Sequence, residues 1–522
     1  IQDYDAEQMS HITTYANPQY YSQEDPNGVT TIISNDNFHF LYNVVALHIR
    51  RLSVNSNGKS VSYLKNISFN ITYNADKDRD LEKIDRQFLD QDLAIIRSLV
   101  ANPEDVTDPD FGTPKLKSTT GTTISPIQTI GIRQAHGLPV YTYCIVTSRD
   151  LAPSFERLIA LKEMRGISAG IVCIEDILEN AYYSAGDTIS NLTDDAGALR
   201  QYLMKAYENG TRYALLGGRP PIVPIRYGYG YNINPSDILT DTELALYNIP
   251  TDMYFANFET NWNKDGDDMF GEVSNDKVSF NPQIFVGRLL CDKREDIENY
   301  LDKLEIYELN PGGGDYSYLN NAFLHFSYQF FKPDNENEVC DSLAEYNTKK
   351  VFHVLDTLLP SINNLYPNVD LSLQNYLSPS PQEVIGMLNS KKYSFFDIHS
   401  HANPSGVNVT YWNGNGSYGI NALDSERKYY REMDGNGLDN ITNFMYPSFS
   451  YSGSCTLMPY DSPKYQNYGS YTPDYDELSW NFGQSYTMGH NYGGVAFLGN
   501  TREGFTDRGA SYQRWFFDIL SK

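Results

Sequence analysis

The chain of 522 residues has few cysteines, few basic residues and no long apolar run. Five cysteines at this length do not predict a disulfide framework, and their odd number leaves at least one thiol outside any disulfide. The net charge of −26 argues against nucleic acid as a partner, because phosphate binding needs clustered Lys and Arg. The sequence contains no run of about 18 apolar residues, so it predicts no membrane span. Since no signal-like apolar stretch follows Ile1, we expect a mature or trimmed soluble chain.

The pattern of the first quarter differs from that of the remainder. A chain this long exceeds the size of a single core, so several domains are expected. Stretches such as "FHFLYNVVALHIRRLSV" and "VSYLKNISFNITYN" alternate polar and apolar residues, which is typical of strands. Residues 101–126 are dense in Pro, Asp, Gly and Thr, as in a loop. The sequence therefore predicts a β-rich N-terminal domain over residues 1–130.

Buried strands and amphipathic helices alternate after this loop. Strands are expected at 140–148, 169–175 and 211–218, with helices at 154–166 and 194–210 between them. This order predicts an α/β fold with a parallel sheet and helices on both faces. We place two subdomains here, 131–310 and 311–522.

Two histidines, His399 and His401, stand at the end of a strand-like run, "YSFFDIHSHANPSG". At positions i and i+2 of a strand both side chains point to one side, a spacing that metal-dependent hydrolases use. A metal site needs three or four ligands, however, and the other histidines are scattered without ligand spacing. The pair can also be two hydrogen-bonded histidines of purely structural role.

A third interpretation joins His401 to Cys455, which ends the strand-like run "FMYPSFSYSGSCTLMP". Parallel strands bring their carboxyl ends to one edge of a sheet, where open α/β folds place their sites. The separation, 455 − 401 = 54 residues, is close to the ~50 residues of caspase-type His/Cys pairs. An imidazole there activates the thiolate nucleophile and protonates the leaving amine. Gly453 and Ser454 allow backbone amides to approach a substrate oxyanion.

Residues from about Tyr143 to Gly504 resemble the gingipain-type cysteine peptidases, relatives of caspases and legumains. The stretches that carry the resemblance are "YCIVTSRDL", "YALLGG", "TDMYFANFETNWNKDGDDMFGEV", "FNPQIFVGRLLCDKREDIENYLDKLEIYE", "FFDIHSHANPSG", "YPSFSYSGSCTLMP" and "GGVAFLGNTREG". The resemblance implies a caspase-like parallel-sheet sandwich in two subdomains and a secreted, periplasmic or surface-located bacterial cysteine endopeptidase that acts on proteins or peptides. It also implies that the N-terminal domain is a propeptide, so that the chain is a zymogen.

The resemblance further assigns His401 as catalytic histidine, Cys455 as nucleophile, and the backbone amides of Cys455 and Ala402 as the oxyanion hole. Two departures stand out. Ser-His-Ala replaces the usual Gly-His-Gly, and Gln329 occupies the place of the acidic residue that orients the histidine. Asp341 lies near the specificity-pocket position of arginine-specific members, with Gln329 as a second candidate for that pocket. The alternatives are a catalytically decayed binding or scaffold protein and, third, a metal-dependent hydrolase that uses His399 and His401.

A separate polar stretch, "NWNKDGDDMFGE", has the spacing of a calcium loop. Its oxygen-bearing residues are Asn261, Asn263, Asp265, Asp267 and Glu272, with Gly266 at the sharp turn. The flanking segments are strand-like, so the loop would lack the helices of an EF-hand. We expect a structural Ca²⁺ here and no cofactor in catalysis; the alternative is a simple polar turn.

Overall fold

The computed structural model divides the chain into two compact units, Ile1–Ile124 and Ser125–Lys522. In the first unit it describes four strands: β1 (Asn35–Phe38), β2 (Tyr42–Val45), β3 (Leu52–Val54) and β4 (Val61–Tyr63). In the second it describes residues 133–229, 248–326, 358–372, 381–461 and 480–520, except 268, 273–274, 401, 405, 411–416, 422–436, 503 and 505. Within these residues no helix combines the length and apolarity needed to cross a bilayer.

The described strands of the first unit form two antiparallel hairpins, β1–β2 and β3–β4. The remainder of the expected β-rich domain lies outside the described residues, so its β-rich character stays a prediction. The boundary between the units, after Ile124, falls close to the predicted boundary near residue 130.

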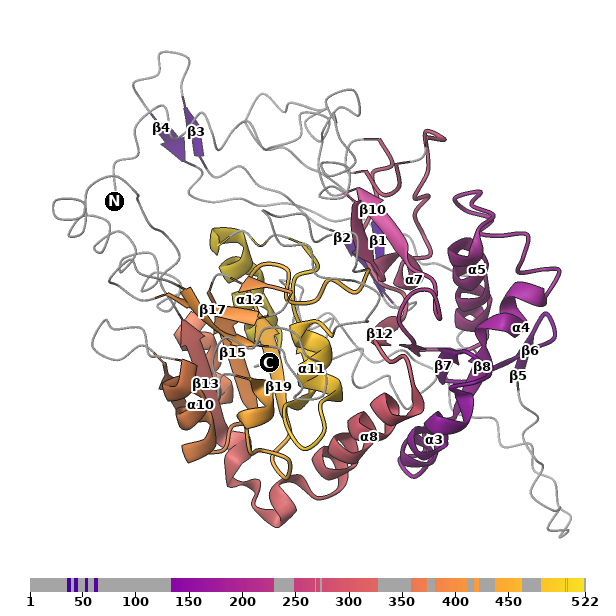
Figure 1. Ribbon diagram of the computed structural model, residues 1–522. Coiled ribbons are helices and arrows are strands. Elements are labelled where there is room, and N and C mark those ends of the chain that lie inside the picture. The colour runs from indigo at the N-terminus through magenta and orange to yellow at the C-terminus, as the bar shows by residue number, and fades with distance from the viewer. Residues whose placement is uncertain are drawn as a thin grey trace, which may run out of the picture. The chain divides into compact units, whose positions relative to one another are not determined.

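The described part of the second unit begins with a hairpin, β5 (Arg133–Ala135) and β6 (Leu138–Val140), and a four-stranded parallel sheet follows (Figure 1). The sheet has the order β12-β9-β7-β8. Its strands are β7 (Tyr143–Thr147), β8 (Ala169–Cys173), β9 (Tyr213–Gly217) and β12 (Phe285–Leu289). The connecting helices and smaller strands are η5 (Ala152–Phe155), α3 (Glu156–Glu163), α4 (Ile174–Glu179), α5 (Asp195–Glu208), β10 (Arg226–Tyr229), β11 (Asn248–Thr251) and α7 (Met253–Ala256). The predicted alternation of strands and helices is confirmed here, including Asp194 as the N-cap of α5, which accepts from the Gly197 amide.

Helix α8 (Arg294–Leu309) and two short turns, η7 (Pro311–Gly314) and η8 (Tyr316–Asn320), lead to a second, five-stranded parallel sheet. Its order is β14-β13-β15-β19-β20. The strands are β13 (Asn321–Phe326), β14 (Asn368–Leu371), β15 (Phe395–His399), β19 (Ser448–Ser452) and β20 (Gly494–Leu498). The remaining named elements are α10 (Pro381–Ser390), β16 (Ala402–Asn403), β17 (Gly406–Thr410), β18 (Ser417–Asn421), η9 (Leu438–Asn440), α11 (Phe482–Met488) and α12 (Thr506–Leu520).

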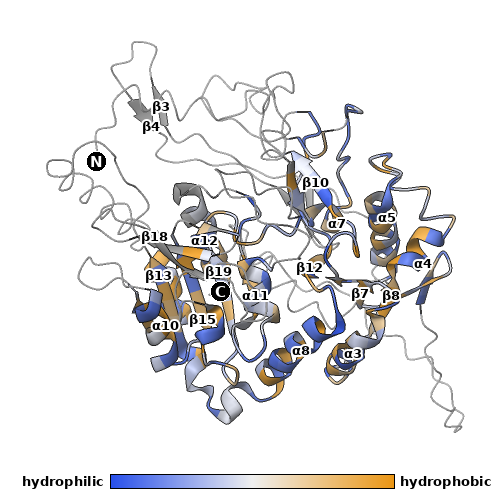
Figure 2. Cartoon of the chain, viewed as in Figure 1, coloured by the Kyte–Doolittle hydropathy of each residue, from blue (hydrophilic) through white to orange (hydrophobic). Residues whose placement is uncertain are grey.

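Hydrophobic clusters pack against both sheets, which explains why their central strands are buried along most of their length. All five residues of β15 are buried. Phe396 and Ile398 pack in one core cluster, whereas Phe395 packs in another, together with Phe517 of α12. In Figure 2 the strands are mostly orange and the outer helices carry blue residues. The predicted α/β class with parallel strands is therefore confirmed, as two sheets.

Helix α8 packs between the two sheets (Figure 1). Its Leu301 belongs to a core cluster that holds Ile145 of β7 as well as Met488 of α11. The predicted subdomain boundary at residue 310 falls just after this helix. The division of this region into two separate subdomains stays a prediction.

Candidate active site and candidate calcium loop

The strand ends that precede His401 and Cys455 lie side by side. Strand β15 pairs in parallel with β19, with Ile398 opposite Ser452. The backbone amide of Gly453 donates to the Ile398 carbonyl over 3.0 Å, and the amide of Ser400 donates to the Ser454 hydroxyl over 3.0 Å. Ser400 and Ser454 immediately precede His401 and Cys455 in the sequence. The two chain segments that carry the candidate catalytic residues are thus joined by direct hydrogen bonds.

Residues after β20 hold the nucleophile segment from another side. The Gly504 amide donates to Cys455 Sγ over 3.4 Å. When it is protonated, Sγ can in turn donate to the Gly504 carbonyl oxygen, 3.8 Å away. The backbone of one residue, Gly504, can therefore accept from a thiol through its carbonyl or donate to a thiolate through its amide, and donation favours the charged form. Asn500 Nδ2 donates to the Ser454 carbonyl over 2.9 Å. The Thr456 amide donates to the Arg502 carbonyl over 2.9 Å, and Thr456 itself has a φ of 38°.

The other described cysteines have environments that suppress the thiolate. Burial raises the pKa of Cys144 to about 12, and burial also raises the pKa of Cys291 and, with nearby carboxylates, that of Cys173. Cys455 is partly exposed. Because only the thiolate is nucleophilic, these three thiols are poor competitors of Cys455 in any reaction. Cys340 lies outside the described residues.

His399 is placed differently from a metal ligand. The ring is only 2% exposed and stacks on Phe326 with ring centroids 5.1 Å apart. Its Nε2 is hydrogen-bonded to Oε1 of Gln513, and burial lowers its pKa to about 4. Among the described residues, the group of side chains arranged to hold an ion does not include His399. The geometry favours the structural role for His399 over the metal-hydrolase interpretation.

Several predicted site residues cannot be placed against this geometry. His401, Gln329 and Asp341 lie outside the described residues. Ala402 is described, in β16, where it pairs with Val407. The catalytic, oxyanion and specificity assignments therefore stay predictions.

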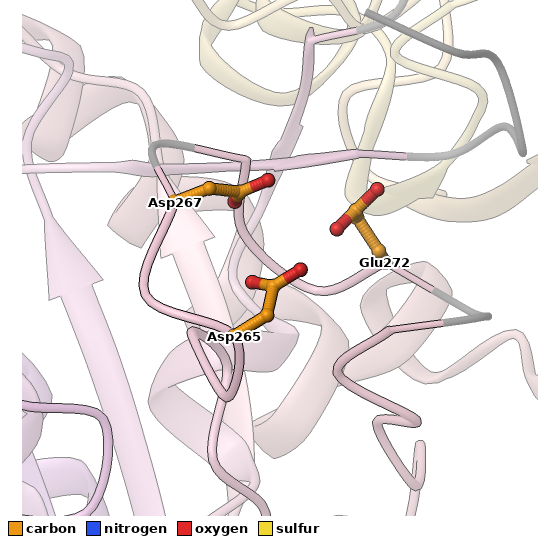
Figure 3. A group of neighbouring side chains, drawn as sticks. All are labelled: Asp265, Asp267 and Glu272. Atoms are coloured by element: carbon orange, nitrogen blue, oxygen red, sulfur yellow. The ribbon is translucent and has the colours of Figure 1, made fainter.

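Three of the five residues proposed for the calcium loop have side chains that lie close together. The carboxylates of Asp265, Asp267 and Glu272 offer oxygen atoms that all lie within 4.8 Å of one another, and Figure 3 shows these side chains converging. Gly266 has a φ of 79°, which is the sharp turn expected at this position. The side-chain oxygen of Asn261 accepts from the Asn263 amide over 2.8 Å. Asn263 Oδ1 is buried and has no hydrogen-bond partner among the described residues.

The sequence did not indicate the residue that closes this loop, Asp276. Its Oδ1 accepts from the Lys264 amide over 2.5 Å, and its Oδ2 accepts from the amides of Gly271 (2.7 Å) and Glu272 (3.1 Å). Burial raises the pKa of Asp276, although these amides oppose the rise, and Asp265 adds to it. Burial likewise raises the pKa of Glu272, with contributions from Asp267 and Asp265. Crowded carboxylates of this kind are stabilised by a cation.

Sequence reasoning missed three further residues near the candidate site. Gln513, Asn500 and Gly504 act through partners far away in the sequence, and no local spacing marks them. Asp397 did carry a signal, since a carboxylate inside the apolar run "SFFDIH" must find a buried partner. The structure supplies that partner from α12, where Gln513 donates to Asp397.

Comparison with known proteins gives a family match and several solved structures of similar arrangement. Residues 138–522 match peptidase family C25. No curated protein matches the chain. A structure described as a protease is 12% identical to this chain, with a TM-score of 0.44. The alignment covers 71% of this chain and 62% of the length of that protease. The Arg-specific cysteine proteinase gingipain R is 15% identical, with a TM-score of 0.44 and coverage of 75% of this chain and 68% of its own.

The complex of the pro- and mature domains of gingipain RgpB from Porphyromonas gingivalis is 15% identical, with a TM-score of 0.43, and covers 73% of this chain and 69% of its own. The family match, in contrast to these distant structures, spans well over half of the 522 residues. It agrees with the gingipain-type resemblance carried by the sequence motifs. The chain belongs to peptidase family C25, the gingipain family.

Proposed function

We propose that this chain is a cysteine endopeptidase with Cys455 as nucleophile and His401 as its acid–base partner. The observation that supports it best is the hydrogen bond between Ser400 and Ser454, the residues just before the two candidates, on adjacent parallel strands. The Gly504 amide, which donates to Cys455 Sγ, adds stabilisation of a thiolate. Family membership points to the same chemistry.

In the proposed mechanism, the Cys455 thiolate attacks the scissile carbonyl carbon and the C=O electron pair moves onto oxygen. The backbone amides of Cys455 and Ala402 stabilise this oxyanion. His401 then donates its proton to the nitrogen of the departing amine as the C–N bond breaks. Finally His401 accepts a proton from water, whose oxygen attacks the thioester and releases the acid and the thiolate.

Cys455→Ala and His401→Ala test this proposal in a peptide-library cleavage assay. Cys455→Ala should abolish cleavage. His401→Ala should slow alkylation of Cys455, and His399→Ala should affect the reaction much less. Full cleavage by Cys455→Ala would refute the proposal. A wild-type chain that binds peptides without cutting them would instead support the decayed binding-protein alternative.

For the substrate pocket, we propose Asp341 as the residue that selects a basic side chain before the cleaved bond, with Gln329 beside it. Asp341→Asn should then lower kcat/KM for Arg- or Lys-containing peptides without changing the rate for neutral ones. An unchanged preference would remove Asp341 from the pocket. We further propose, from the family resemblance, that the enzyme works outside the bacterial cytoplasm, which cell fractionation tests.

We propose a second role for the loop from Asn261 to Glu272, the binding of a structural Ca²⁺. The supporting observations are that Asp265, Asp267 and Glu272 converge, and that Oδ1 of Asn263 in the same loop is buried without a hydrogen-bond partner among the described residues. Oxygen ligands of this kind suit a hard cation. An ion that binds only the folded state stabilises it by about 2.7 kcal/mol at a hundred times Kd.

Calcium should therefore raise the Tm after chelation, and Asp265→Ala combined with Glu272→Ala should remove the gain. Asp150→Ala, an exposed carboxylate elsewhere, is the matched control and should keep it. An equal Tm with chelator and with millimolar calcium would refute the calcium site.

We also propose that the first unit restrains the enzyme as a propeptide. Lys115 and Lys117 precede β5, whereas Arg133 lies within β5, where its guanidinium donates to the Asn209 carbonyl over 3.2 Å. Cleavage is therefore expected before the β5–β6 hairpin, and it should raise peptidase activity. The isolated N-terminal piece, added back, should lower activity again. If cleavage changes nothing while the pieces remain associated, the unit is an accessory domain.

A further inference from the structure

A buried polar cluster lies beneath the segment that carries Cys455. It consists of Asp397 and His399 on β15 and Gln513 on α12, which are 0%, 2% and 0% exposed. Asp397 and His399 are two residues apart on the strand, so they project from the same face. Phe517, one helical turn after Gln513, packs on Phe395 of the same strand, with ring centroids 5.1 Å apart. Helix α12 therefore runs along this face and presents Gln513 to both polar residues.

The hydrogen bonds assign a role to each atom of the cluster. Gln513 Nε2 donates to Asp397 Oδ1, which leaves Gln513 Oε1 to accept from His399 Nε2. The ring must then carry its proton on Nε2. Among the described residues Asp397 Oδ2 has no hydrogen-bond partner. Burial raises the pKa of the Asp397 carboxyl well above its ordinary value and lowers the pKa of His399 to about 4.

The His399 ring also touches the chain close to the nucleophile. A side-chain Cβ at Gly453 would lie 2.5 Å from His399 Cε1, so only glycine allows this approach. Gly453 is fixed to β15 by its hydrogen bond to the Ile398 carbonyl, and Cys455 follows two residues later. A continuous set of contacts thus runs from Gln513 through His399 and Gly453 to Cys455.

We propose that Gln513 is a positioning residue for Cys455. By holding the His399 ring in one orientation, it keeps Gly453, and with it the nucleophile, in register with the histidine strand. This inference rests on the proposed peptidase function, and Gln513 acts without touching the substrate. Misplacement of a reacting group by about 1 Å can cost a factor of about 100 in rate.

Gln513→Met keeps the side-chain length and removes both hydrogen bonds. It should lower kcat about tenfold or more and leave KM within about twofold. Asp397→Asn retains the acceptor for Gln513 and should keep most of kcat, whereas Asp397→Leu removes it and should resemble Gln513→Met. If Gln513→Met does not fold, kcat of Asp397→Asn and kcat of Asp397→Leu can be compared instead.

Phe517→Leu is the matched control on the same helix. It weakens packing on Phe395 and should lower the Tm but leave kcat of the folded enzyme unchanged. Equal loss of kcat in Phe517→Leu and Gln513→Met would overturn the proposal, because general loosening of α12 would then be sufficient. Unchanged kcat in Gln513→Met would overturn it as well.

Alkylation of Cys455 by iodoacetamide separates this proposal from the peptidase proposal. Gln513→Met should be alkylated about tenfold more slowly than the wild type at pH 7, even if the wild type cleaves no peptide. Absence of cleavage with slowed alkylation would refute the peptidase and support the positioning role. Equal alkylation rates would refute the positioning role alone.

Discussion

Lys303 offers a sharp test of how the two sheets are joined. It lies on α8, is 0% exposed, and its Nζ donates to the carbonyl oxygens of Tyr486 (3.2 Å), Gly489 (2.9 Å) and Tyr492 (2.8 Å). Burial lowers its pKa to about 7 from an ordinary value of 10.5. Two effects oppose each other here. Burial disfavours the ammonium, whereas three carbonyl acceptors match its three N–H donors.

The sign of the pH dependence follows from proton linkage. Between pH 7 and 10.5 the unfolded chain keeps a proton on Lys303 that the folded chain releases, so stability rises with pH in this window. This contribution of Lys303 to the free energy of unfolding is fully present above pH 10.5 and is lost as the pH falls towards 7. From pH 7 to pH 9 the gain amounts to about 2 kcal/mol.

The assay is urea unfolding of the wild type and of Lys303→Met at pH 7 and pH 9. The methionine variant lacks the titrating group and leaves the three carbonyls without their donor, at about 1–3 kcal/mol for each unsatisfied buried group. The free energy of unfolding of the wild type, relative to the variant, should be about 2 kcal/mol higher at pH 9 than at pH 7. A difference that stays constant with pH would refute the reasoning, because it would mean that the carbonyls keep Lys303 protonated in the folded chain.

Two further substitutions probe the segment that carries Cys455 and the buried ion pair between Arg200 and Asp187. Gly504→Ala would bring a Cβ to 2.6 Å from Asn500 Nδ2 and 2.8 Å from the Gly453 carbonyl oxygen, so alkylation of Cys455 should slow about tenfold. The control is Gly287→Ala, where the new Cβ would have no atom within 4 Å and the alkylation rate should not change. Equal rates in both variants would contradict the contact between Gly504 and Cys455. Arg200→Met leaves the fully buried Asp187 without its ion-pair partner and should cost about 3–5 kcal/mol in urea unfolding, with a smaller cost when Asp187→Asn is added. A loss below about 1 kcal/mol in the single variant would contradict a stabilising role for this ion pair.

The sequence predicted those features that depend on local periodicity and spacing. Strands β7, β8 and β9 and helix α5 follow from runs of apolar residues, and the turn at Gly266 follows from the spacing of its neighbours. The adjacency of β15 and β19 followed from one rule, that parallel strands share a carboxyl edge.

Features that depend on distant partners could not be predicted in the same way. His399 and Asp397 meet Gln513 across 114 and 116 residues, and Lys303 meets its carbonyls across more than 180. A sequence can show that a buried polar group needs a partner, but it does not name that partner. For this reason His399 had several interpretations until α12 was placed against it.

The nucleophile segment is also fixed at its far end, and this affects how the site can fail. Asp461 forms a buried, bidentate ion pair with Arg502, at 3.0 and 2.6 Å. The neighbouring Tyr460 ring lies under the guanidinium of Arg288, with 5.5 Å to its centroid. Arg288 belongs to β12 in the other sheet, where it pairs with Asp252 at 2.8 and 2.9 Å.

The chain from Gly453 to Asp461 thus begins on the five-stranded sheet and ends against a buried arginine of the four-stranded one. Gln484 of α11 repeats the link, since its Nε2 donates to the Leu290 carbonyl over 3.0 Å. A substitution that separates the sheets removes one support of the nucleophile segment, even where it lies far from Cys455. The position of Cys455 and the docking of the two sheets are therefore coupled, and Lys303→Met should reduce Cys455 reactivity as well as stability.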